Sequence, residues 1–215
     1  MRAQSAEAKG RARARRRAPS VVVLAAGESS RFPGTKQLAQ FRGKSLLERA
    51  LGSIPLDEVG EVMLVLGHDA EAVAKEAGRR EGVKVVINRA YHRGLSTSIR
   101  AGIMALATDT DGVMLLLADQ PFVTRALVRR MVRAFEERAP VRKIVALAYG
   151  DLVAPPVIFS REYFGELMEL EGDHGAKSVI DRHKDSLCLV KVKARAVLAD
   201  VDTRDDLRAA RRSGL

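Results

Sequence analysis

The chain has 215 residues, enough for one domain with a buried core, and its hydrophobic content of 47% is ordinary for a globular protein. Aromatic residues make up only 4% and tryptophan is absent, which argues against a stacking surface for single-stranded nucleic acid. Of the net charge of +10, most lies in residues 1–18, so the remaining chain is only mildly basic and suits a small anionic substrate.

The first segment in chain order is residues 1–18, rich in arginine and alanine, which we expect to form a disordered basic tail. A nucleic-acid-binding arm or a targeting peptide is the alternative for this tail. The apolar run at 21–26 is too short for a secretory signal, and no run reaches the ~18–20 residues of a membrane span. The lone Cys188 cannot form an internal disulfide. A cytoplasmic domain over residues 19–215 is therefore expected.

After the tail, short apolar runs alternate with amphipathic segments. The predicted strands cover 20–26, 61–67, 83–88, 113–118, 144–149, 155–159, 187–192 and 197–201. The predicted helices cover 44–54, 69–79, 96–107, 124–138, 161–169, 175–183 and 204–212. Strands without polar alternation are typical of a parallel sheet covered by helices, so we predict a Rossmann-like three-layer α/β/α sandwich with a mostly parallel sheet. Two prolines at 155–156 predict an edge or irregular strand there.

The loop after the first strand is the first candidate site, and its sequence is Leu-Ala-Ala-Gly-Glu-Ser-Ser-Arg-Phe-Pro-Gly-Thr-Lys. Small residues allow a ligand to approach the backbone, whose N–H groups can point at phosphate oxygens. Arg31 offers two parallel donors and Lys36 a point charge, which together suit a triphosphate. The alternative is a tight turn with two solvated cations. The predicted nucleotide-binding residues of this loop are Leu24, Ala25, Ala26, Gly27, Glu28, Ser29, Ser30, Arg31 and Lys36.

This loop resembles the signature of the nucleotidyltransferase superfamily with the GT-A-type, Rossmann-like fold: Leu-Ala-Ala-Gly-x-Ser-x-Arg-Phe followed by Lys. Over residues 20–212 the chain is most similar to the molybdenum cofactor cytidylyltransferases. The resemblance implies a GT-A-type fold and transfer of CMP from CTP to molybdopterin. It favours CTP over GTP because the guanylyl branch more often has Ala-Gly-Gly in this loop.

Two aspartates at the ends of predicted strands are candidate magnesium ligands. Asp119 follows the most hydrophobic run, where a carboxylate is costly unless it is paired or binds a metal. Asp202 follows the predicted strand 197–201 and offers a second carboxylate, with Thr203 as cap of the last helix. A plain helix cap is the alternative role for each aspartate. The resemblance extends to Leu-x-Asp-Gln-Pro and Asp-x-Asp-Thr and implies that Asp119 and Asp202 hold Mg²⁺.

Two glycine-containing segments are candidate substrate contacts. In residues 88–102 the resemblance implies that Gly94 and Ser98 contact the base and ribose. The alternative is a purely structural role for this segment, in which Ser96 caps a helix. We interpret His92 as an ordinary loop histidine.

Residues 172–177 resemble the family's Gly-Asp-x-Gly-Ala-Arg segment on the pterin side, and lysine replaces the commoner arginine, which keeps the charge but loses the planar fork. Upstream, Ala-Pro-Pro at 154–156 stands where the family often has Gly-His-Pro or Gly-Asn-Pro, so a polar acceptor contact is expected to be missing. The acceptor-binding residues that the resemblance implies are Gly172, Asp173, Gly175 and Lys177.

The hypothesis is attack by an acceptor phosphate on the α-phosphorus of the triphosphate, which needs no general base because the phosphate is already ionised. Arg31, Lys36 and Asp119 are the predicted catalytic residues. The expected partners are CTP or another NTP, a molybdopterin-type acceptor, and a molybdoenzyme or insertion chaperone, with no membrane or nucleic acid. The alternatives are guanylyltransfer to the same cofactor, nucleotidyltransfer to a sugar phosphate, and nucleic-acid binding through the tail.

Overall fold

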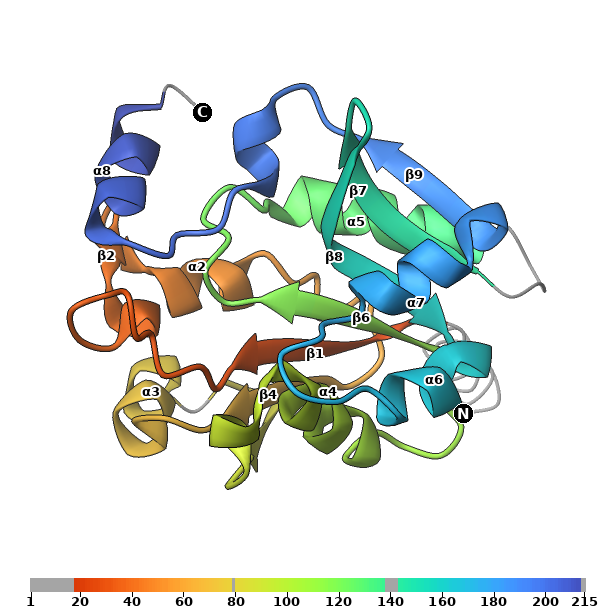
Figure 1. Cartoon of the computed structure of the whole chain (residues 1–215), viewed down its shortest axis with the longest axis horizontal. Helices are drawn as coiled ribbons and strands as arrows, with labels where there is room; N and C mark the ends of the chain where they lie inside the picture. Colours follow the sequence, from red (N-terminus) through yellow and green to blue (C-terminus); the bar gives the residue numbers. More distant parts are fainter. Residues whose placement is uncertain (1–17, 79, 138–142, 214–215) are drawn as a thin grey trace, which may run out of the picture.

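The computed structural model describes residues 18–78, 80–137 and 143–213, in which seven strands form one sheet in the order β5-β4-β1-β6-β8-β7-β9 (Figure 1). The strands are β1 (Ser20–Ala25), β4 (Val62–Leu66), β5 (Val83–Ile87), β6 (Gly112–Leu117), β7 (Ile144–Tyr149), β8 (Leu152–Ser160) and β9 (Leu187–Lys191). All of these run parallel except β8, which pairs antiparallel with both β6 and β7. The predicted mostly parallel sheet is confirmed.

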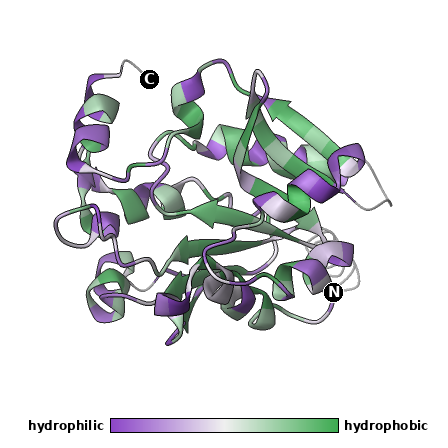
Figure 2. Ribbon diagram, viewed as in Figure 1, coloured by the Kyte–Doolittle hydropathy of each residue, from purple (hydrophilic) through white to green (hydrophobic). Residues whose placement is uncertain are grey.

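Helices cover both faces of the sheet. Val21 and Val23 of β1 pack into a core with α2 (Leu46–Gly52), α3 (Ala70–Ala77) and α5 (Arg125–Glu136). Val22 and Leu24 point to the opposite face and pack with α4 (Leu95–Met104), α6 (Phe164–Met168) and α7 (Lys177–Arg182). Figure 2 shows the hydrophobic strands between helices that carry their hydrophilic residues outside. The predicted three-layer α/β/α sandwich is therefore confirmed.

Several helix ends agree with their sequence signals. Thr124 caps α5, where its side chain accepts a hydrogen bond from the N–H of Leu127. Thr203 caps α8 (Arg204–Arg212) in a reciprocal capping box with Asp206. Asp69 precedes α3, but its side chain makes no capping hydrogen bond. The two threonines therefore cap their helices, whereas Asp69 does not.

A short hairpin was missed by the sequence analysis. Strands β2 (Gln40–Phe41) and β3 (Lys44–Ser45) pair across a turn at Arg42 and Gly43, whose φ angles are +50° and +79°. Helix α2 begins only at Leu46, behind the Ser45 cap, so the predicted helix start at residue 44 was two residues early. Helix α8 lies beside this hairpin, and Arg211 donates a hydrogen bond to the carbonyl of Gln40 (Figure 1).

The predicted strand 197–201 was wrong. Arg195–Leu198 form a single turn of 3-10 helix, η5, and the chain then continues without strand pairing to Thr203. The apolar residues Leu198 and Val201 are three positions apart and enter two different hydrophobic clusters, one under the sheet and one under α8. Because a strand would place them on opposite faces of one sheet, a turn followed by an extended connection buries both better.

Strand β8 is irregular, as predicted, but it is not an edge strand. It lies between β6 and β7, and the register with β7 shifts between Ala146 and Leu147. Val157 pairs with Ala146 and Ala154 pairs with Leu147, so Pro155 and Pro156 fall outside the regular ladder. A proline without an N–H is tolerated in an interior strand at such a bulge.

The predicted tail lies almost wholly outside the described residues, which begin at the buried Ala18. Within the described part of the chain, no helix has both the length and the apolar character needed to cross a membrane.

Candidate functional site

A cavity of about 410 Å³ opens at the carboxyl ends of β1 and β6. In open α/β sheets this end of the strands is where ligands bind. The cavity is lined by the loop after β1, the short helix η2 (Tyr91–Arg93), the start of α4 and the end of β6. Its lining residues are Leu24, Ala26, Gly27, Glu28, Ser29, Ser30, Lys36, Gln37, Tyr91, His92, Gly94, Leu95, Ser98, Leu117, Ala118, Asp119 and Asp173.

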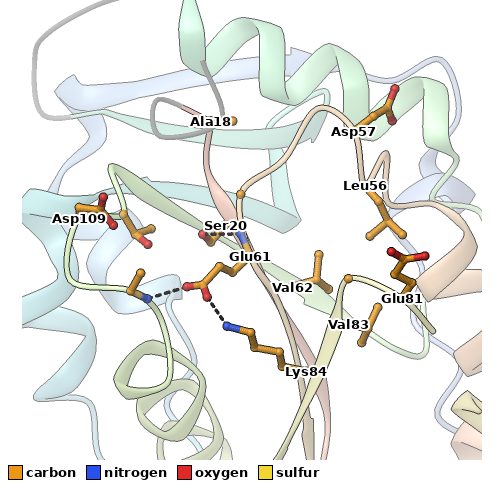
Figure 3. Close-up of a pocket in the computed structure, with 14 residues that line it drawn as sticks. Ala18, Ser20, Leu56, Asp57, Glu61, Val62, Glu81, Val83, Lys84 and Asp109 are labelled. Carbon is orange, nitrogen blue, oxygen red and sulfur yellow. Dashed lines mark hydrogen bonds and ion pairs between the residues drawn. The ribbon is translucent and has the colours of Figure 1, made fainter. Parts of the chain in front are cut away.

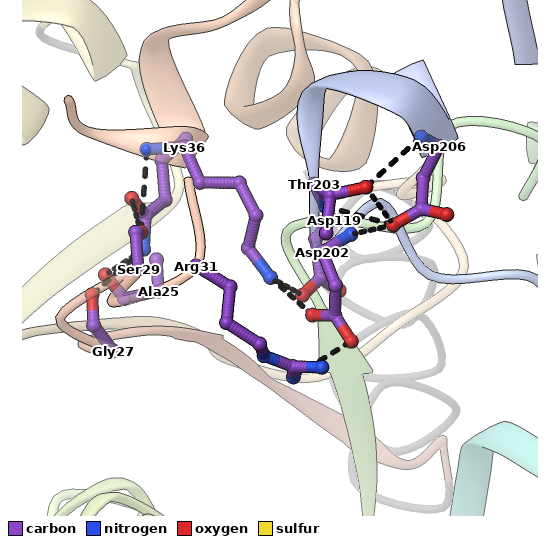
Figure 4. A network of polar contacts seen from close by, with 10 residues as sticks. Ala25, Gly27, Ser29, Arg31, Lys36, Asp119, Asp202, Thr203 and Asp206 are labelled. Atoms are coloured by element: carbon purple, nitrogen blue, oxygen red, sulfur yellow. Dashed lines mark hydrogen bonds and ion pairs between the residues drawn. The ribbon is translucent and has the colours of Figure 1, made fainter. Parts of the chain in front are cut away.

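At the rim of this cavity, one ammonium group joins the two predicted metal ligands. Lys36 Nζ lies 2.7 Å from Asp119 Oδ2 and 3.0 Å from Asp202 Oδ1. Arg31 contacts the other oxygen of Asp202 at 2.9 Å (Figure 4). The structure therefore brings together four residues that the sequence analysis named separately.

The ammonium of Lys36 is held in its charged form. Burial alone would lower its pKa, but the carboxylates of Asp119 and Asp202 outweigh burial, and the pKa is raised above its usual value. Only 12% of the Lys36 side chain is exposed, whereas 70% of the Arg31 side chain is exposed. The pair of carboxylates is thus matched to one sheltered cation and one solvated cation.

Hydrogen bonds to three other segments fix the position of Asp119. The N–H of Ala118 donates to the carbonyl of Leu24 at the end of β1, at 3.2 Å. The N–H of Val201 donates to the carbonyl of Asp119 at 3.0 Å, which brings the segment carrying Asp202 alongside. The side chain of Gln120 donates to the carbonyl of Pro155 at 3.1 Å. These contacts explain why two acids far apart in sequence meet at one point.

The residues at this point fit a divalent cation. The Oδ1 atom of Asp119 is buried and accepts no hydrogen bond from the described residues, so one strong acceptor remains available. Asp202 supplies a second carboxylate beside it. Among the described residues no group of three histidine, cysteine or acidic side chains could hold a metal alone. Two carboxylates completed by substrate phosphates are the usual arrangement for Mg²⁺.

Asp200 is a third acid near the same point, and the sequence analysis gave it no role. Although the residue is exposed, removal of water from its carboxyl group and repulsion by Asp119 and Asp202 raise its pKa to about 6. The concentration of negative charge at this end of the sheet therefore has a cost that a bound cation would relieve.

Gln37 holds the loop after β1 in shape and was missed by the sequence analysis. Its buried side chain donates hydrogen bonds to the carbonyls of Ala25 and Gly27, at 3.2 and 3.4 Å. Ser29 has a φ angle of +57°, and its hydroxyl accepts from the N–H of Lys36 at 3.3 Å. A polar residue directly after the lysine was the available signal. These hydrogen bonds of Gln37 fold the loop after β1 back toward its own start.

The predicted base-binding segment forms the opposite wall of the cavity. Ser98 is buried, and its hydroxyl accepts a hydrogen bond from Asn88 at 3.0 Å. Gly94 has a φ angle of +107° and precedes α4, whereas Ser96 is not a cap because the helix begins at Leu95. His92, which we interpreted as a loop residue, lines the cavity next to Tyr91. The roles of these residues toward a base stay predictions.

The predicted acceptor segment touches the base-binding segment directly. A Cβ atom on Gly94 would lie 2.2 Å from the carbonyl carbon of Gly172, so the two backbones are in contact. Asp173 lines the cavity, and Gly175 packs near Leu95. Lys177 is exposed at the start of α7 and does not line the cavity. The structure thus places Asp173 on the cavity wall and leaves Lys177 outside it, whereas Gly172 and Gly175 lie against the lining residues Gly94 and Leu95.

A larger cavity, of about 970 Å³, lies at the other end of the sheet, near the amino ends of β1, β4 and β5 (Figure 3). Its charged centre is already paired, because Glu61 contacts Lys84 at 2.5 Å and accepts the N–H of Ala107 at 2.6 Å. This cavity contains none of the residues that the sequence analysis singled out as functional. We therefore place the candidate site at the smaller cavity.

Several known proteins are similar to this chain over most of its length. The crystal structure of Rv0371c from Mycobacterium tuberculosis H37Rv is 32% identical and covers 91% of this chain and 98% of that one, with a TM-score of 0.78. Rv0371c in complex with manganese is 31% identical, with a TM-score of 0.74 over 91% of this chain and 98% of that one. Nicotine blue oxidoreductase from Paenarthrobacter nicotinovorans is 32% identical over 138 residues. That match covers 64% of this chain and 65% of the oxidoreductase.

The family comparison covers most of the sheet and most of the site. The MobA-like NTP transferase domain matches residues 21–187, which include the loop after β1, Asp119 and the segment 172–177. Asp202 lies beyond the matched range, although the structure brings it to the same ammonium group. The match extends over most of the chain, and the protein belongs to the MobA-like NTP transferase family as a nucleotidyltransferase of that type.

Proposed function

We propose that this protein transfers CMP from CTP to the terminal phosphate of a molybdopterin-type cofactor and releases pyrophosphate, with Mg²⁺ as its metal. The observation that carries the proposal is the meeting of Asp119 and Asp202 at Lys36, beside the cavity under the loop after β1. The preference for CTP is supported by the Ala-Ala-Gly form of that loop. The molybdopterin acceptor is supported by the resemblance of residues 172–177 to the pterin-side segment.

The residues of this chain divide the work of the reaction. The loop after β1 would bind the triphosphate through its backbone N–H groups, while Lys36 and Arg31 balance its negative charge. An oxygen of the acceptor phosphate bonds to the α-phosphorus as the bond to the bridging oxygen breaks, and pyrophosphate leaves with both bonding electrons. Because positioning and charge balance suffice for this reaction, no general base is required among the side chains.

Asp119 and Asp202 would hold the divalent cation. When bound, Mg²⁺ neutralises phosphate charge and orients the phosphate oxygens. Asp119 Oδ1, buried without a partner among the described residues, is the atom best prepared for this role. The base would lie toward Gly94 and Ser98, and the acceptor toward Asp173, because these residues form the far wall of the same cavity.

The test is pyrophosphate release from CTP, GTP, ATP and UTP in turn, with Mg²⁺, in the presence and absence of a molybdopterin acceptor. Acceptor-dependent release from CTP alone is the expected result. Release from GTP alone would instead assign guanylyltransfer, and release that requires a sugar phosphate would replace the acceptor. Absence of acceptor-dependent release from every NTP would contradict the proposed function.

A second candidate is a redox reaction, because one curated relative carries the name of an oxidoreductase. A reaction of this kind consumes a reductant and releases no pyrophosphate. The same samples should therefore be followed for oxidation of NADH and NADPH. Oxidation without pyrophosphate release would favour the second candidate.

A further inference from the structure

We propose that Lys36 acts as a built-in substitute for the metal ion, which holds the two carboxylates together in the free protein and moves to the triphosphate when the metal arrives. The structure shows the first half of this exchange. Lys36 Nζ lies within hydrogen-bond distance of Asp119 Oδ2 and Asp202 Oδ1 at once, at 2.7 and 3.0 Å. A single cation therefore already bridges the two acids.

The position of Lys36 in the chain makes the exchange possible. The residue lies at the start of the short helix η1 (Lys36–Leu38), at the end of the loop that lines the cavity. Its side chain reaches from the loop across to the carboxylates (Figure 4). The ammonium group of a lysine stands on a flexible chain of four carbons. It can therefore turn from the carboxylates toward the cavity without movement of the backbone.

Arg31 repeats the arrangement in a weaker form. Among the described residues it forms an ion pair with Asp202, and 70% of its side chain is exposed to solvent. Both cations of the loop thus contact acids. The metal must compete with them for the carboxylates, and the triphosphate must compete with the carboxylates for them.

The exchange couples metal and nucleotide binding. Metal alone displaces a cation that then has no anion to contact, and nucleotide alone must draw Lys36 away from two carboxylates. Bound together, each ligand removes the competitor of the other, so their affinities rise together. The site therefore favours the metal–nucleotide complex over either part.

This inference rests on the proposed function, because it assumes that the two acids hold a metal and the loop holds a triphosphate. Its test uses binding without turnover. Free Mn²⁺ is measured by electron paramagnetic resonance in titrations of the nucleotide-free, full-length protein. We expect Lys36→Met to bind Mn²⁺ about 5- to 100-fold more tightly than the wild type, the range of typical coupling between sites.

Two further variants separate the bridge from a general charge effect. Lys184→Met removes the same charge from an exposed residue that does not line the cavity, so its Mn²⁺ affinity should equal that of the wild type. Arg31→Met should tighten Mn²⁺ binding less than Lys36→Met does, because Arg31 forms an ion pair with Asp202, whereas Lys36 bridges Asp119 and Asp202. Unchanged or weaker Mn²⁺ binding by Lys36→Met, or equal tightening by Lys184→Met, would overturn the inference.

A reciprocal measurement keeps the test valid if Lys36→Met does not fold. Asp119→Asn should bind CTP and GTP more tightly than the wild type in a buffer that contains EDTA, because Lys36 is partly released. Asp173→Asn removes a charge from the same cavity, but the described ion pairs of Lys36 are with Asp119 and Asp202, so this variant should show a smaller gain. An equal gain in the two variants would count against the exchange.

The two hypotheses fail separately. If no NTP yields pyrophosphate but Lys36→Met still tightens Mn²⁺ binding, the proposed reaction is wrong. The hypothesis that Lys36 substitutes for the metal ion is then retained. If pyrophosphate is released and the Mn²⁺ affinity of Lys36→Met is unchanged, the reaction stands and the exchange is wrong.

Discussion

The two ends of the sheet carry cavities of opposite character. At the amino ends of the strands, the larger cavity surrounds an acid that is fully paired: Glu61 contacts Lys84 and the N–H of Ala107. At the carboxyl ends, the smaller cavity is lined by Asp119, which shares Lys36 with Asp202, and both acids repel the carboxylate of Asp200. The candidate site therefore lies at the smaller of these two cavities.

The two ends also differ in what their charges do to the fold. Glu61 has its pKa held below the usual value, chiefly by the hydrogen bond from Lys84, with the N–H of Ala107 adding to it against burial. Asp200 has its pKa raised to about 6 by loss of water and by neighbouring acids. One end thus stabilises the folded chain, and the other is under electrostatic strain, as is common where a protein binds a ligand.

The largest expected effect is on turnover. Asp119→Asn should lower pyrophosphate release by at least about a hundredfold, the scale of losing one essential charge contact at a reaction centre. The matched control is Glu61→Gln, which makes the same acid-to-amide change at the other end of the sheet and should leave turnover unchanged. Comparable losses in both variants would remove the distinction between the two ends.

A smaller effect is expected from Gly94→Ala. The new Cβ atom would lie 2.2 Å from the carbonyl carbon of Gly172, at a φ angle of +107° that alanine disfavours. The base and acceptor segments must then separate, and we expect the KM for nucleotide to rise by about tenfold, or ~1.4 kcal/mol. Gly150→Ala, where φ is +57° and no atom lies within 4 Å of the new Cβ, measures the backbone strain alone. A KM near the wild-type value in Gly94→Ala would show that the contact is not needed.

The two ends should respond to loss of a charge with opposite changes in stability. Asp200→Asn should raise the free energy of unfolding at pH 8 by no more than about 1 kcal/mol, because the exposed carboxylate is partly screened. The raised pKa means that the folded state carries this penalty only when the acid is ionised. The gain should therefore shrink as the pH falls through 6 and vanish below the unfolded value near 3.9. Chemical denaturation at several pH values measures it, and destabilisation at pH 8 would contradict it.

Glu61→Gln should lower the free energy of unfolding at pH 7 by about 1 kcal/mol, the scale of a partly exposed ion pair with one added hydrogen bond. Because the pKa of Glu61 is depressed in the folded state, the wild type gains this stability above the unfolded value near 4.3 and loses it as the pH falls through the folded value. The two unfolding curves should therefore converge in acid. A constant difference down to pH 3 would mean that ionisation of Glu61 is not the cause.

Much of the site could be predicted because its residues follow apolar runs. The runs ending at Ala25 and Leu117 are strands buried on both faces, and their loops have only the carboxyl edge of the sheet in which to emerge. The loop after β1 and Asp119 therefore emerge at the same edge, where Lys36 contacts Asp119. Asp119 and Asp202 share Lys36 because the N–H of Val201 donates to the carbonyl of Asp119. No local sequence pattern encodes this backbone contact.

The errors arise where tertiary packing outweighs local pattern. Residues 197–201 have the composition of a strand, but Leu198 and Val201 are drawn into separate clusters. Prolines normally mark an edge, yet β8 is interior because its bulge removes Pro155 and Pro156 from the ladder. Gln37 was not predicted because its hydrogen-bond partners are backbone carbonyls. Every residue has such a carbonyl, so the sequence does not indicate which ones Gln37 contacts. Each error concerns a contact between segments far apart in the chain.

Lys36 and Asp202 are separated by 166 residues in the sequence, and this separation affects how the site forms during synthesis of the chain. A ribosome adds roughly 5–20 residues per second, so Asp202 is joined to the chain on the order of ten seconds after Asp119. During that interval the loop after β1 and the central strands are already made, while Lys36 has one of its two acidic partners. The growing chain therefore acquires the complete pair of carboxylates only after the central strands of the sheet have been made.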